Sequence, residues 1–503
     1  MLRKIESSAL FFSILSGGLL ALAFNNGRLW ILAWFAFVPL FFSLNNKTSK
    51  QTFWLFYVSG ITFWAGTVYW LVNVTLVGTI LLVLYLALYS AIFGLIIRPF
   101  TRAARFCILF FIPAVWVLLE YARSHLLTGF PWDLLGYSQY LNLPVIQIAD
   151  ITGVWGISFL VILVNVAIVG IIWSLKTRLF SRLKVIVVSV ILLFSLVLFY
   201  GYLRLASFKP APEAQAIKIS LIQGNIPQEL KWDSGARDSI MRSYFELTSQ
   251  AAKDNSDLII WPEAALPVVL EEEPEYYSRL GEYLKTINKP LLFGSVTQKG
   301  GLYYNSALLL SGDARLLNQY DKLHLVPFGE YIPFRNSLKF MDTIAPIGDI
   351  TRGKDYTIFK LPGFPAGFGV LICFEDVFPE LARNFVSRGA GFLVNITNDA
   401  WFGKTPEAYQ HLAASVFRAI ENRVYLARSA NTGVSAFISP LGKIISDLSD
   451  KKGNNLFIAG YCSDSLKISK PKPSFYNLHG DIFPLICFLF FLYVIIFKNH
   501  NKK

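Results

Sequence analysis

Three residues of different chemistry, Glu263, Lys322 and Cys373, each follow an apolar run that indicates a β-strand. A thiol, a carboxylate and an ammonium group are the parts of an enzyme that works by covalent catalysis. The thiol attacks a carbonyl carbon, the carboxylate moves the proton, and the cation favours the thiolate and stabilises the oxyanion. A strand exit also suits Glu263, because partial loss of hydration makes a carboxylate a stronger base. The sequence therefore predicts an enzyme with Cys373 as its nucleophile.

The cysteines leave a second interpretation of Cys373 open. Free cysteine is common in protein cores, and Cys373 could also form a disulfide with Cys462, the only other cysteine between residues 216 and 465. Cys107 and Cys487 lie inside apolar runs, where we expect them to pack rather than react.

Charge and histidine spacing argue against several other classes of protein. The formal net charge is +13, but no basic helix with interleaved aromatic residues accompanies it, so we expect no binding of nucleic acid. His324 and His411 lack the spacing of metal ligands. We predict neither a metal ion nor another cofactor.

Apolar residues dominate the chain, which predicts a membrane protein. Hydrophobic residues make up 54% of the 503 residues and charged residues only 16%, whereas a soluble globular chain carries more charge. Eight apolar runs approach the length of a transmembrane helix. They are residues 9–24, 29–44, 53–72, 76–97, 106–121, 153–173, 185–203 and 482–497.

Positive charges alternate between the loops that connect these runs, and Lys and Arg are retained on the cytoplasmic side of a membrane. The alternate, poorly charged loops hold little more than Arg28 and Arg123. Seven crossings from a cytoplasmic start thus place residues 216–465 outside the cytoplasm, and an eighth returns the C-terminus inside. The charges on the cytoplasmic side are Arg3, Lys4, Lys47, Lys50, Arg98, Arg102, Arg105, Lys176, Arg178, Arg182, Lys184, Lys498, Lys502 and Lys503.

Residues 1–24 also have the features of a cleaved signal peptide: a basic start, an apolar stretch and the small residues Ala21 and Ala23. The short link at residues 25–28 to the next apolar run instead favours a helical hairpin. Cleavage would leave the topology of the later runs unchanged.

Two charged residues, Glu120 and Arg123, stand at the outer end of the fifth run, where a charge is costly unless it is paired. Their spacing puts them on one helix face and predicts a pair with either a structural or a functional role. The next stretches, residues 128–132 and 134–148, are too broken by Gly and Pro to span, but they are apolar enough to lie in the outer interface.

A Pro-containing linker, residues 208–212, leads into a block whose apolar runs are short and regularly spaced. Alternating strands and helices predict a layered α/β domain. The predicted strands are residues 218–222, 258–261, 290–293, 306–310, 368–372, 391–394 and 434–438, and the predicted helices are 237–253, 275–287, 379–388 and 408–427. The expected domains are therefore a seven-helix membrane domain (1–205), an α/β domain (216–465) and a C-terminal transmembrane helix (482–497).

The order of the three reactive residues resembles the nitrilase superfamily, whose members use a Glu, Lys, Cys triad. The resemblance implies that Glu263 is the general base, Lys322 stabilises the transition state and Cys373 is the nucleophile, with Glu330 assisting. It also implies an α/β/β/α sandwich for the soluble block.

Further motifs, over nearly the whole chain, are similar to the apolipoprotein N-acyltransferase family. In that family a carboxylate two residues after the Cys matters, and Glu375 supplies it here. A Tyr often follows the Cys directly, whereas this chain has Phe374, which lacks the hydroxyl but keeps a backbone N–H for the oxyanion. The motifs are residues 223–228 with Lys231 and Trp232, residues 327–333, 398–403 and 418–423, and, in the membrane part, Glu120, Arg123 and residues 128–132.

The resemblance implies a specific reaction. Members of the family take an acyl chain from a phospholipid, typically phosphatidylethanolamine, hold it as a Cys thioester, and pass it to the α-amine of the N-terminal diacylglyceryl-cysteine of an apolipoprotein. It implies a multi-pass protein of the bacterial cytoplasmic (inner) membrane with ping-pong kinetics. Trp232, Phe328, Tyr331 and Trp401 would then be apolar lids over an acyl channel, or simply packing residues.

Two other functions fit part of the sequence. A membrane-tethered amidase or nitrilase would use the same triad with water as the acceptor. A transporter would use the helices and treat the soluble block as an accessory. The apolar runs, however, contain few ionisable residues and no pair of broken helices for a site at the membrane midplane.

Overall fold

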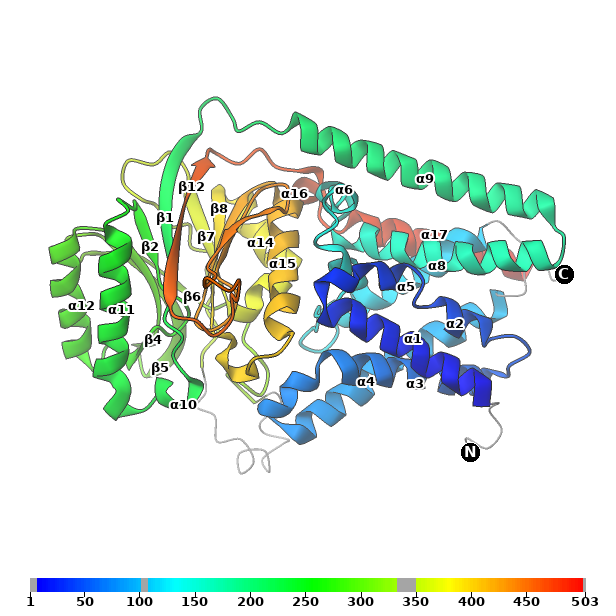
Figure 1. The fold of residues 1–503 in the computed structure, drawn as a ribbon, viewed down its shortest axis with the longest axis horizontal. Coiled ribbons are helices and arrows are strands. Elements are labelled where there is room, and N and C mark those ends of the chain that lie inside the picture. Colours follow the sequence, from blue (N-terminus) through cyan, green and yellow to red (C-terminus); the bar gives the residue numbers. More distant parts are fainter. Residues whose placement is uncertain (1–6, 101–106, 333–349, 501–503) are drawn as a thin grey trace. The chain divides into compact units, whose positions relative to one another are not determined.

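The computed structural model describes residues 7–100, 107–332 and 350–500, and the chain divides into two compact units (Figure 1). One unit holds the N-terminal helices up to Ser207, residues Thr405–Ala413 and the C-terminal segment from His479. The other holds residues Phe208–Lys404 and Ala414–Leu478.

The first unit is helical. Its α-helices are α1 (Ser7–Asn25), α2 (Val38–Phe42), α3 (Ser49–Thr67), α4 (Leu76–Ile97), α5 (Ile108–His125), α6 (Leu143–Ile146), α7 (Ala149–Thr152), α8 (Val154–Lys176), α9 (Phe180–Ser207) and α17 (Ile482–His500). Its 3₁₀ helices are η2 (Gly27–Trp34), η3 (Tyr69–Asn73), η4 (Arg98–Phe100) and η5 (Leu135–Gln139).

Five helices of the described residues are long and apolar enough to cross a membrane: α1, α4 with its extension to Phe100, α5, α8 and α9. The apolar stretch of α17, Ile482–Phe497, is shorter. The structure thus gives several candidate spans and does not fix the predicted number of eight. The charges Arg3, Lys4, Arg102, Arg105, Lys502 and Lys503, on which the predicted orientation partly rests, lie outside the described residues.

The second apolar run, residues 29–44, is wrong as a single helix. The segment η2 has 3₁₀ geometry with a kink at Leu29, and α2 begins only at Val38, with Pro39 in its first turn. Proline has no N–H to donate inside a helix, so it starts a new helix rather than continuing the previous one. The run stays apolar throughout, so hydropathy alone does not reveal the break.

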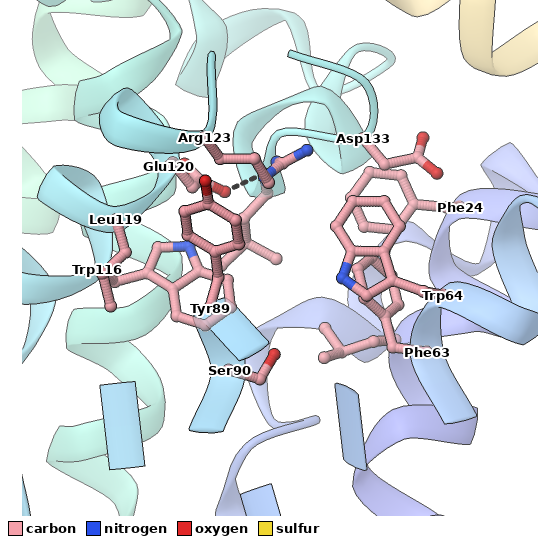
Figure 2. A pocket seen from close by; sticks show the side chains of 12 residues that line it. Phe24, Phe63, Trp64, Tyr89, Ser90, Trp116, Leu119, Glu120, Arg123 and Asp133 are labelled. Atoms are coloured by element: carbon pink, nitrogen blue, oxygen red, sulfur yellow. Dashed lines mark hydrogen bonds between the residues drawn. The ribbon is translucent and has the colours of Figure 1, made fainter. Parts of the chain in front are cut away.

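Glu120 and Arg123 of α5 point toward each other, as Figure 2 shows. Glu120 Oε1 accepts a hydrogen bond from the backbone N–H of Leu135 at 2.7 Å. Arg123 Nη1 donates to the carbonyl oxygens of Phe130 and Trp132, at 2.7 Å each. The two charged side chains therefore hold the Gly- and Pro-containing segment after α5, and the segment gives these buried groups the polar partners that they need.

The second unit is built on two β-sheets. The seven-stranded sheet has the order β12-β1-β2-β4-β5-β6 with β3 beside β4, and the five-stranded sheet has the order β11-β10-β9-β8-β7. The strands are β1 (Gln215–Gln223), β2 (Leu258–Ile260), β3 (Leu266–Val269), β4 (Leu291–Lys299), β5 (Leu302–Leu310), β6 (Leu316–Asp321), β7 (Gly367–Ile372), β8 (Ala390–Thr397), β9 (Tyr425–Ala430), β10 (Ala436–Ile438), β11 (Ile444–Asp447) and β12 (Gly460–Ile468).

Helices cover the outer faces of the two sheets (Figure 1). The helices α11 and α12 lie on the seven-stranded sheet, and α14 and α15, of which the part from Ala414 belongs to this unit, lie on the five-stranded sheet. The unit is therefore the α/β/β/α sandwich that the family resemblance implies. The helical segments are α10 (Gln228–Lys231), η6 (Ser234–Ala236), α11 (Arg237–Ala252), α12 (Pro274–Ile287), η7 (Cys373–Val377), α14 (Pro379–Ser387), η8 (Asp399–Phe402), α15 (Glu407–Asn422) and α16 (Phe475–His479).

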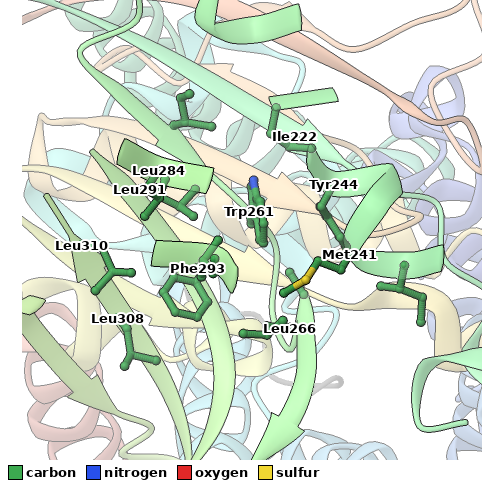
Figure 3. Packing of buried hydrophobic residues seen from close by; sticks show 14 of the residues in the cluster. Ile222, Met241, Tyr244, Trp261, Leu266, Leu284, Leu291, Phe293, Leu308 and Leu310 are labelled. Carbon is green, nitrogen blue, oxygen red and sulfur yellow. The ribbon is translucent and has the colours of Figure 1, made fainter. Parts of the chain in front are cut away.

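An apolar core fills the space between the seven-stranded sheet and its helices (Figure 3). At the end of β2, the Trp261 ring stacks on Tyr244 of α11 with the ring centroids 4.8 Å apart. The Trp261 indole Nε1–H donates to the Thr248 hydroxyl at 2.8 Å. Both interactions bury Trp261 completely and satisfy its polar atom. Because Glu263 follows two residues later, this packing fixes the point from which its side chain projects.

Every strand that the apolar runs predict is present, but the predicted helix 408–427 is wrong at its C-terminal end. The helix α15 ends at Asn422, Arg423 has a left-handed φ of +55°, and residues Tyr425–Ala430 form β9. This strand pairs in parallel with the buried β8. Pairing with a buried neighbour decides the conformation against the local helical pattern. The strands β3, β9, β11 and β12 were not predicted, and β6 corresponds to the strand expected before Lys322, for which no bounds were predicted.

Candidate active site

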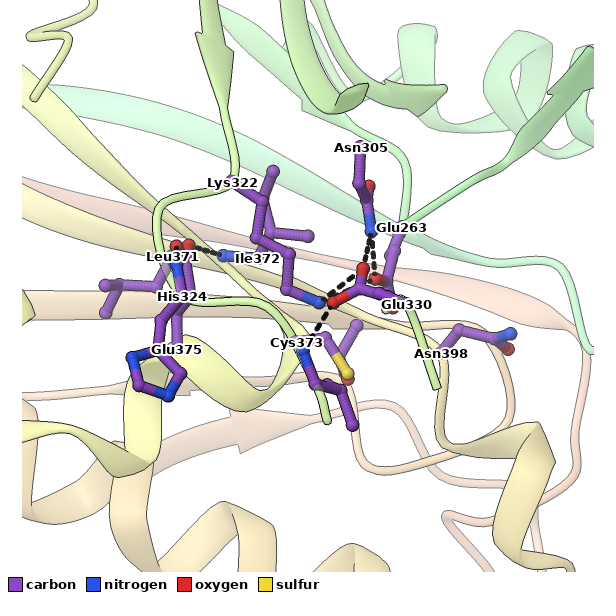
Figure 4. A network of polar contacts seen from close by, with 12 residues as sticks. Glu263, Asn305, Lys322, His324, Glu330, Leu371, Ile372, Cys373, Glu375 and Asn398 are labelled. Atoms are coloured by element: carbon purple, nitrogen blue, oxygen red, sulfur yellow. Dashed lines mark hydrogen bonds and ion pairs between the residues drawn. The ribbon is translucent and has the colours of Figure 1, made fainter. Parts of the chain in front are cut away.

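The structure brings Glu263, Lys322 and Cys373 together at one edge of the sandwich (Figure 4). Glu263 follows β2, Lys322 comes directly after β6, and Cys373 comes directly after β7. Lys322 Nζ lies 3.5 Å from Glu263 Oε1. Two of these residues come from the seven-stranded sheet and the third from the five-stranded sheet, so only the packed sandwich assembles the group.

A close approach of two backbones positions Glu263. Ala264 has a left-handed φ of +45°, which turns the chain directly after Glu263. Gly294 of β4 lies against this turn, and a Cβ at Gly294 would stand 2.7 Å from Glu263 Cα and 2.6 Å from the Ala264 nitrogen. Only glycine leaves room for the turn at this distance. Glu263 is 7% exposed, so its carboxylate is largely removed from bulk water.

Lys322 is an almost completely buried ammonium group, with 1% of its surface exposed. Its Nζ lies 3.0 Å from Glu330 Oε1 as well as 3.5 Å from Glu263 Oε1. Burial works to lower the pKa of Lys322, but the carboxylates of Glu330 and Glu263 outweigh it and raise that pKa above its usual range. Lys322 is therefore a permanent cation in the site.

Cys373 occupies a strained turn at the end of β7. Its φ is +53°, in the left-handed region that non-glycine residues seldom adopt. Its carbonyl oxygen accepts a hydrogen bond from Asn395 Nδ2 at 3.1 Å, which helps to hold the turn. Burial, followed by the charge of Glu263, raises the pKa of the Cys373 thiol well above its usual range, and Lys322 offsets only part of this effect. The expected preference for thiolate is therefore absent from the resting site, and the thiol needs a base to lose its proton.

Glu330 and Asn305 complete the polar cluster. Glu330 Oε2 accepts from the backbone N–H of Val326 at 2.8 Å. Asn305 Nδ2 donates to both Glu263 Oε1 and Glu330 Oε1, at 2.8 Å each. Glu330 was predicted through its motif, whereas Asn305 lies within β5, carries no motif of its own and was not predicted.

Glu375 is a fully buried carboxylate that joins the Lys322 segment to the Cys373 turn. Its Oε1 accepts from the Tyr320 hydroxyl at 2.8 Å and from the backbone N–H groups of Leu323 at 2.6 Å and His324 at 3.0 Å. Its Oε2 accepts from the N–H of Ile372 at 2.8 Å. Burial raises the pKa of Glu375 to about 7, even though these hydrogen bonds favour the ionised form. Glu375 thus positions the residues beside both the cation and the nucleophile.

Lys231 is a second buried lysine at the site that sequence reasoning does not single out as a site residue. Its Nζ donates to the Glu263 carbonyl oxygen at 2.8 Å, and the residue is 1% exposed. Burial lowers the pKa of Lys231 to about 8, against the opposing effect of Glu263 and Cys373. The hydrogen bond holds the backbone of Glu263 in place.

A buried ion network supports the turn from the five-stranded sheet. Arg428 of β9 donates to Asn395 Oδ1 at 2.6 Å, and Asn395 in turn binds the Cys373 carbonyl oxygen. Arg428 also forms ion pairs with Asp376 at 3.2 Å and with Asp399 at 3.1 Å. Because all of these groups are buried and partnered, they form a rigid support rather than a reactive set.

The expected lid residues are exposed aromatic side chains on segments next to the site. Trp232 is 47% exposed, Phe328 40% and Trp401 48%, while Tyr331 is partly buried. Trp232 directly follows Lys231, and Phe328 stands two residues before Glu330. Large apolar side chains exposed in this way usually mark a surface that contacts another molecule.

The geometry supports neither a disulfide between Cys373 and Cys462 nor a reactive role for His324. Cys373 and Cys462 form no disulfide with each other in the described part of the chain. The His324 ring packs on Phe378 with the centroids 3.7 Å apart. The phenyl ring of Phe374 lies against Phe378 as well, at 5.2 Å, which leaves the backbone N–H as the polar group of that residue.

Comparisons with known proteins agree over both parts of the chain. Residues 16–167 match the apolipoprotein N-acyltransferase N-terminal domain, and residues 218–460 match the carbon–nitrogen hydrolase family. A Geobacter metallireducens protein named apolipoprotein N-acyltransferase is 41% identical over 496 residues, which cover 94% of this chain and 92% of that protein. A Rickettsia prowazekii protein of the same name is 30% identical and is matched over 98% of each chain.

Solved structures match about half of the chain, at lower sequence identity. An amidase of the nitrilase superfamily from Nesterenkonia is 18% identical with a TM-score of 0.40, covering 54% of this chain and 96% of the amidase. A carbon–nitrogen hydrolase from Helicobacter pylori is 16% identical with a TM-score of 0.39, covering 50% of this chain and 89% of that chain.

Proposed function

Because the chain belongs to the apolipoprotein N-acyltransferase family, we propose that it transfers an acyl chain from a phospholipid, through a thioester on Cys373, to apolipoproteins. The acceptor is the α-amine of the N-terminal diacylglyceryl-cysteine, and the reaction is a step of lipoprotein maturation. The observation that carries the mechanism is the approach of Lys322 and Glu263 to a thiol at a strained turn.

The acyl donor is a membrane phospholipid, with phosphatidylethanolamine as the proposed donor. Both substrates are anchored in lipid, so a site held at the membrane by apolar helices meets them by diffusion in two dimensions. Helices of this kind have no use in an enzyme whose substrate is a soluble amide. Trp232, Phe328, Tyr331 and Trp401 are the proposed contacts for the acyl chain, since three of them expose large apolar surfaces.

The first half of the reaction forms the thioester. Glu263 accepts the thiol proton while Cys373 Sγ attacks the ester carbonyl carbon of the phospholipid. Lys322 and the backbone N–H of Phe374 stabilise the oxyanion of the tetrahedral intermediate. The intermediate collapses by breaking the ester C–O bond, and Glu263 returns the proton to the departing lysophospholipid. Glu330 and Glu375 support this step by fixing Lys322 and the segments beside it.

The second half uses the same groups in reverse. The amine of the lipopeptide attacks the thioester carbon, Glu263 accepts a proton from the nitrogen, and a C–N bond forms while the C–S bond breaks. Glu263 then protonates the leaving thiolate, which restores Cys373 and the ionised base. No step consumes water, and exclusion of water from the thioester is what separates this reaction from hydrolysis.

Purified protein mixed with phosphatidylethanolamine in detergent micelles is expected to release one equivalent of lysophospholipid per active site and then stop. Turnover should begin only when a diacylated lipopeptide is added, because the thioester needs an amine to complete the cycle. Lysophospholipid and free fatty acid are measured by mass spectrometry. Steady release of free fatty acid without lipopeptide would identify a hydrolase instead, and matched phosphatidylglycerol in place of phosphatidylethanolamine tests the choice of donor.

The proposed arrangement in the bacterial cytoplasmic membrane has eight crossings. The membrane domain comprises residues 1–205, the catalytic domain residues 216–465, and the last transmembrane helix residues 482–497. In this arrangement the catalytic domain faces the periplasm, which follows from the alternation of Lys and Arg between the loops. The acceptor lipoproteins would then be reached on the outer face of the membrane.

Two engineered cysteines test this orientation. In sealed cells, a membrane-impermeant maleimide is expected to label Lys253→Cys and to spare Lys176→Cys, because the proposed topology puts only Lys253 outside. Both lysines are exposed on their own units, so the comparison is matched for accessibility. Lysed cells serve as the control, since both positions should then react equally. Labelling of Lys176→Cys alone in sealed cells would show that the orientation is the reverse of the proposed one.

A further inference from the structure

The side-chain amide of Asn305 stands between two carboxylates of the site (Figure 4). Its Nδ2 donates to Glu263 Oε1 and to Glu330 Oε1, at 2.8 Å each. The same two oxygens face Lys322 Nζ, at 3.5 and 3.0 Å. The two carboxylates therefore share one cation and one neutral group with two N–H donors.

Lys322 is the ammonium group that faces both carboxylates, and its single charge compensates only one of them, while Lys231 binds the backbone carbonyl oxygen of Glu263. Two carboxylates that share a site disfavour double ionisation, so that one of them tends to bind a proton. A proton bound at Glu263 would stop it from accepting the thiol proton. The amide of Asn305 adds two hydrogen bonds to the ionised forms without adding charge, and such bonds favour ionisation.

The local structure fixes the position and orientation of the Asn305 side-chain amide. Its carbonyl oxygen accepts from the Lys322 N–H at 2.9 Å, next to the antiparallel pair Ser306 and Asp321 of β5 and β6, so the ladder sets its position. Its Oδ1 is buried and has no hydrogen-bond partner in the part of the chain that the structure describes. Turning the amide over would aim this oxygen at two carboxylates, so the orientation with Nδ2 inward is the stable one.

We propose that Asn305 is a positioning residue that keeps Glu263 and Glu330 ionised side by side, with Glu263 ready to accept the thiol proton. The proposal rests on the proposed function for the role of Glu263 as the base. Other groups share the field at Glu263 and stay in place when Asn305 is changed. They are Lys322 after β6, Lys231 of α10, Cys373 after β7, and, at longer range, Glu375 and Asp399.

Asn305→Asp is the decisive variant, because it keeps the shape of the side chain and puts a third carboxylate beside the two that already share Lys322. The rate of Cys373 alkylation by iodoacetamide and the lysophospholipid burst are each measured across a pH series. We expect the acid limb of both profiles to move to higher pH by about one to two pH units, with much of the loss recovered at alkaline pH. Mass spectrometry of peptides separates Cys373 from the other three cysteines.

Two further variants separate charge from shape. Asn305→Ala removes both donors and adds no charge, so its acid limb should move in the same direction but less far. Asn318→Asp adds the same charge to the partly buried strand β6, away from the cluster, and should keep the wild-type profile. Thermal unfolding confirms that each variant is folded, and Asn305→Ser, which keeps one donor, replaces Asn305→Asp if the latter does not fold.

A wild-type acid limb in Asn305→Asp and Asn305→Ala, with or without a uniform loss of rate, would overturn the proposal, because a merely structural role lowers the rate at every pH. An equal shift in Asn318→Asp would overturn the proposal too, since a negative charge added away from the cluster would then have the same effect as one added at Asn305. If wild-type protein gives no lysophospholipid burst, the proposed function fails, but the alkylation profiles still decide on Asn305.

Discussion

Protein with Cys373→Ala is expected to acquire no acyl chain from phospholipid and to release no lysophospholipid, while it remains folded in the membrane. The thiol is the only nucleophile at the strained turn, and its loss removes the bond that would carry the acyl group. Alanine keeps the Cβ at this turn, so the backbone strain is the same before and after the change. Intact-mass measurement of the purified protein after incubation with phospholipid should show one added acyl chain in wild type and none in the variant.

Cys462→Ala is the matched control, because it removes the other cysteine of the same unit. Burial raises the pKa of Cys462 to about 12, so its thiol is a poor nucleophile, and activity should stay near the wild-type value. An acyl chain on Cys462, or lasting turnover in Cys373→Ala, would show that the nucleophile lies elsewhere.

Lys322→Met is expected to slow acyl-enzyme formation by about 10²–10³-fold or more. Methionine has nearly the length of lysine but no charge, so the variant loses the cation that faces the developing oxyanion. It also leaves Glu263 and Glu330 without their shared counter-charge. The rate constant of the first turnover measures the effect. Thermal unfolding should show a lower midpoint, because breaking a buried ion pair leaves unpaired charges.

Lys285→Met provides the comparison, since it removes an exposed lysine of α12 in the same unit. Its rate should equal that of wild type. In a Cys373→Ala background, Lys322→Met should cost no further activity, because the effects of substitutions within one catalytic unit are not additive. A Lys322→Met protein that forms acyl-enzyme at the wild-type rate would remove Lys322 from the mechanism.

The strand ends that carry Glu263 and Cys373 could be predicted, because an apolar run precedes each of them. Glu263 and Cys373 follow runs that are buried on both faces, and such runs remain apolar without interruption. The alternation of strands and helices predicts a layered α/β domain, whereas the sandwich was expected from the family resemblance. Lys322 was predicted through its motif and its place after a strand, while its burial and its two carboxylate partners depend on the fold.

Asn305 and β12 could not be predicted from local sequence. Asn305 reaches the site because β5 pairs with β6 in one register, which no short segment encodes. The strand β12 carries three consecutive polar residues, Ser463, Asp464 and Ser465, and its place comes from pairing with β1, far away in the chain. The end of α15 shows the same limit, since burial beside β8 makes a strand out of residues that fit a helix. In each case the missing information is the identity of a distant neighbour.

The pairing of β1 with β12 brings the two ends of the α/β block next to each other. Gln215, at the start of the first strand, lies opposite Ile468, at the end of the last, so the catalytic block begins and ends on neighbouring strands about 5 Å apart. To the helices before and after it, the block is therefore an insertion whose two junctions occupy the space of one loop. A block taken from a relative could therefore be joined at this one seam, provided that residues Thr405–Ala413, which belong to the helical unit, are kept from this chain.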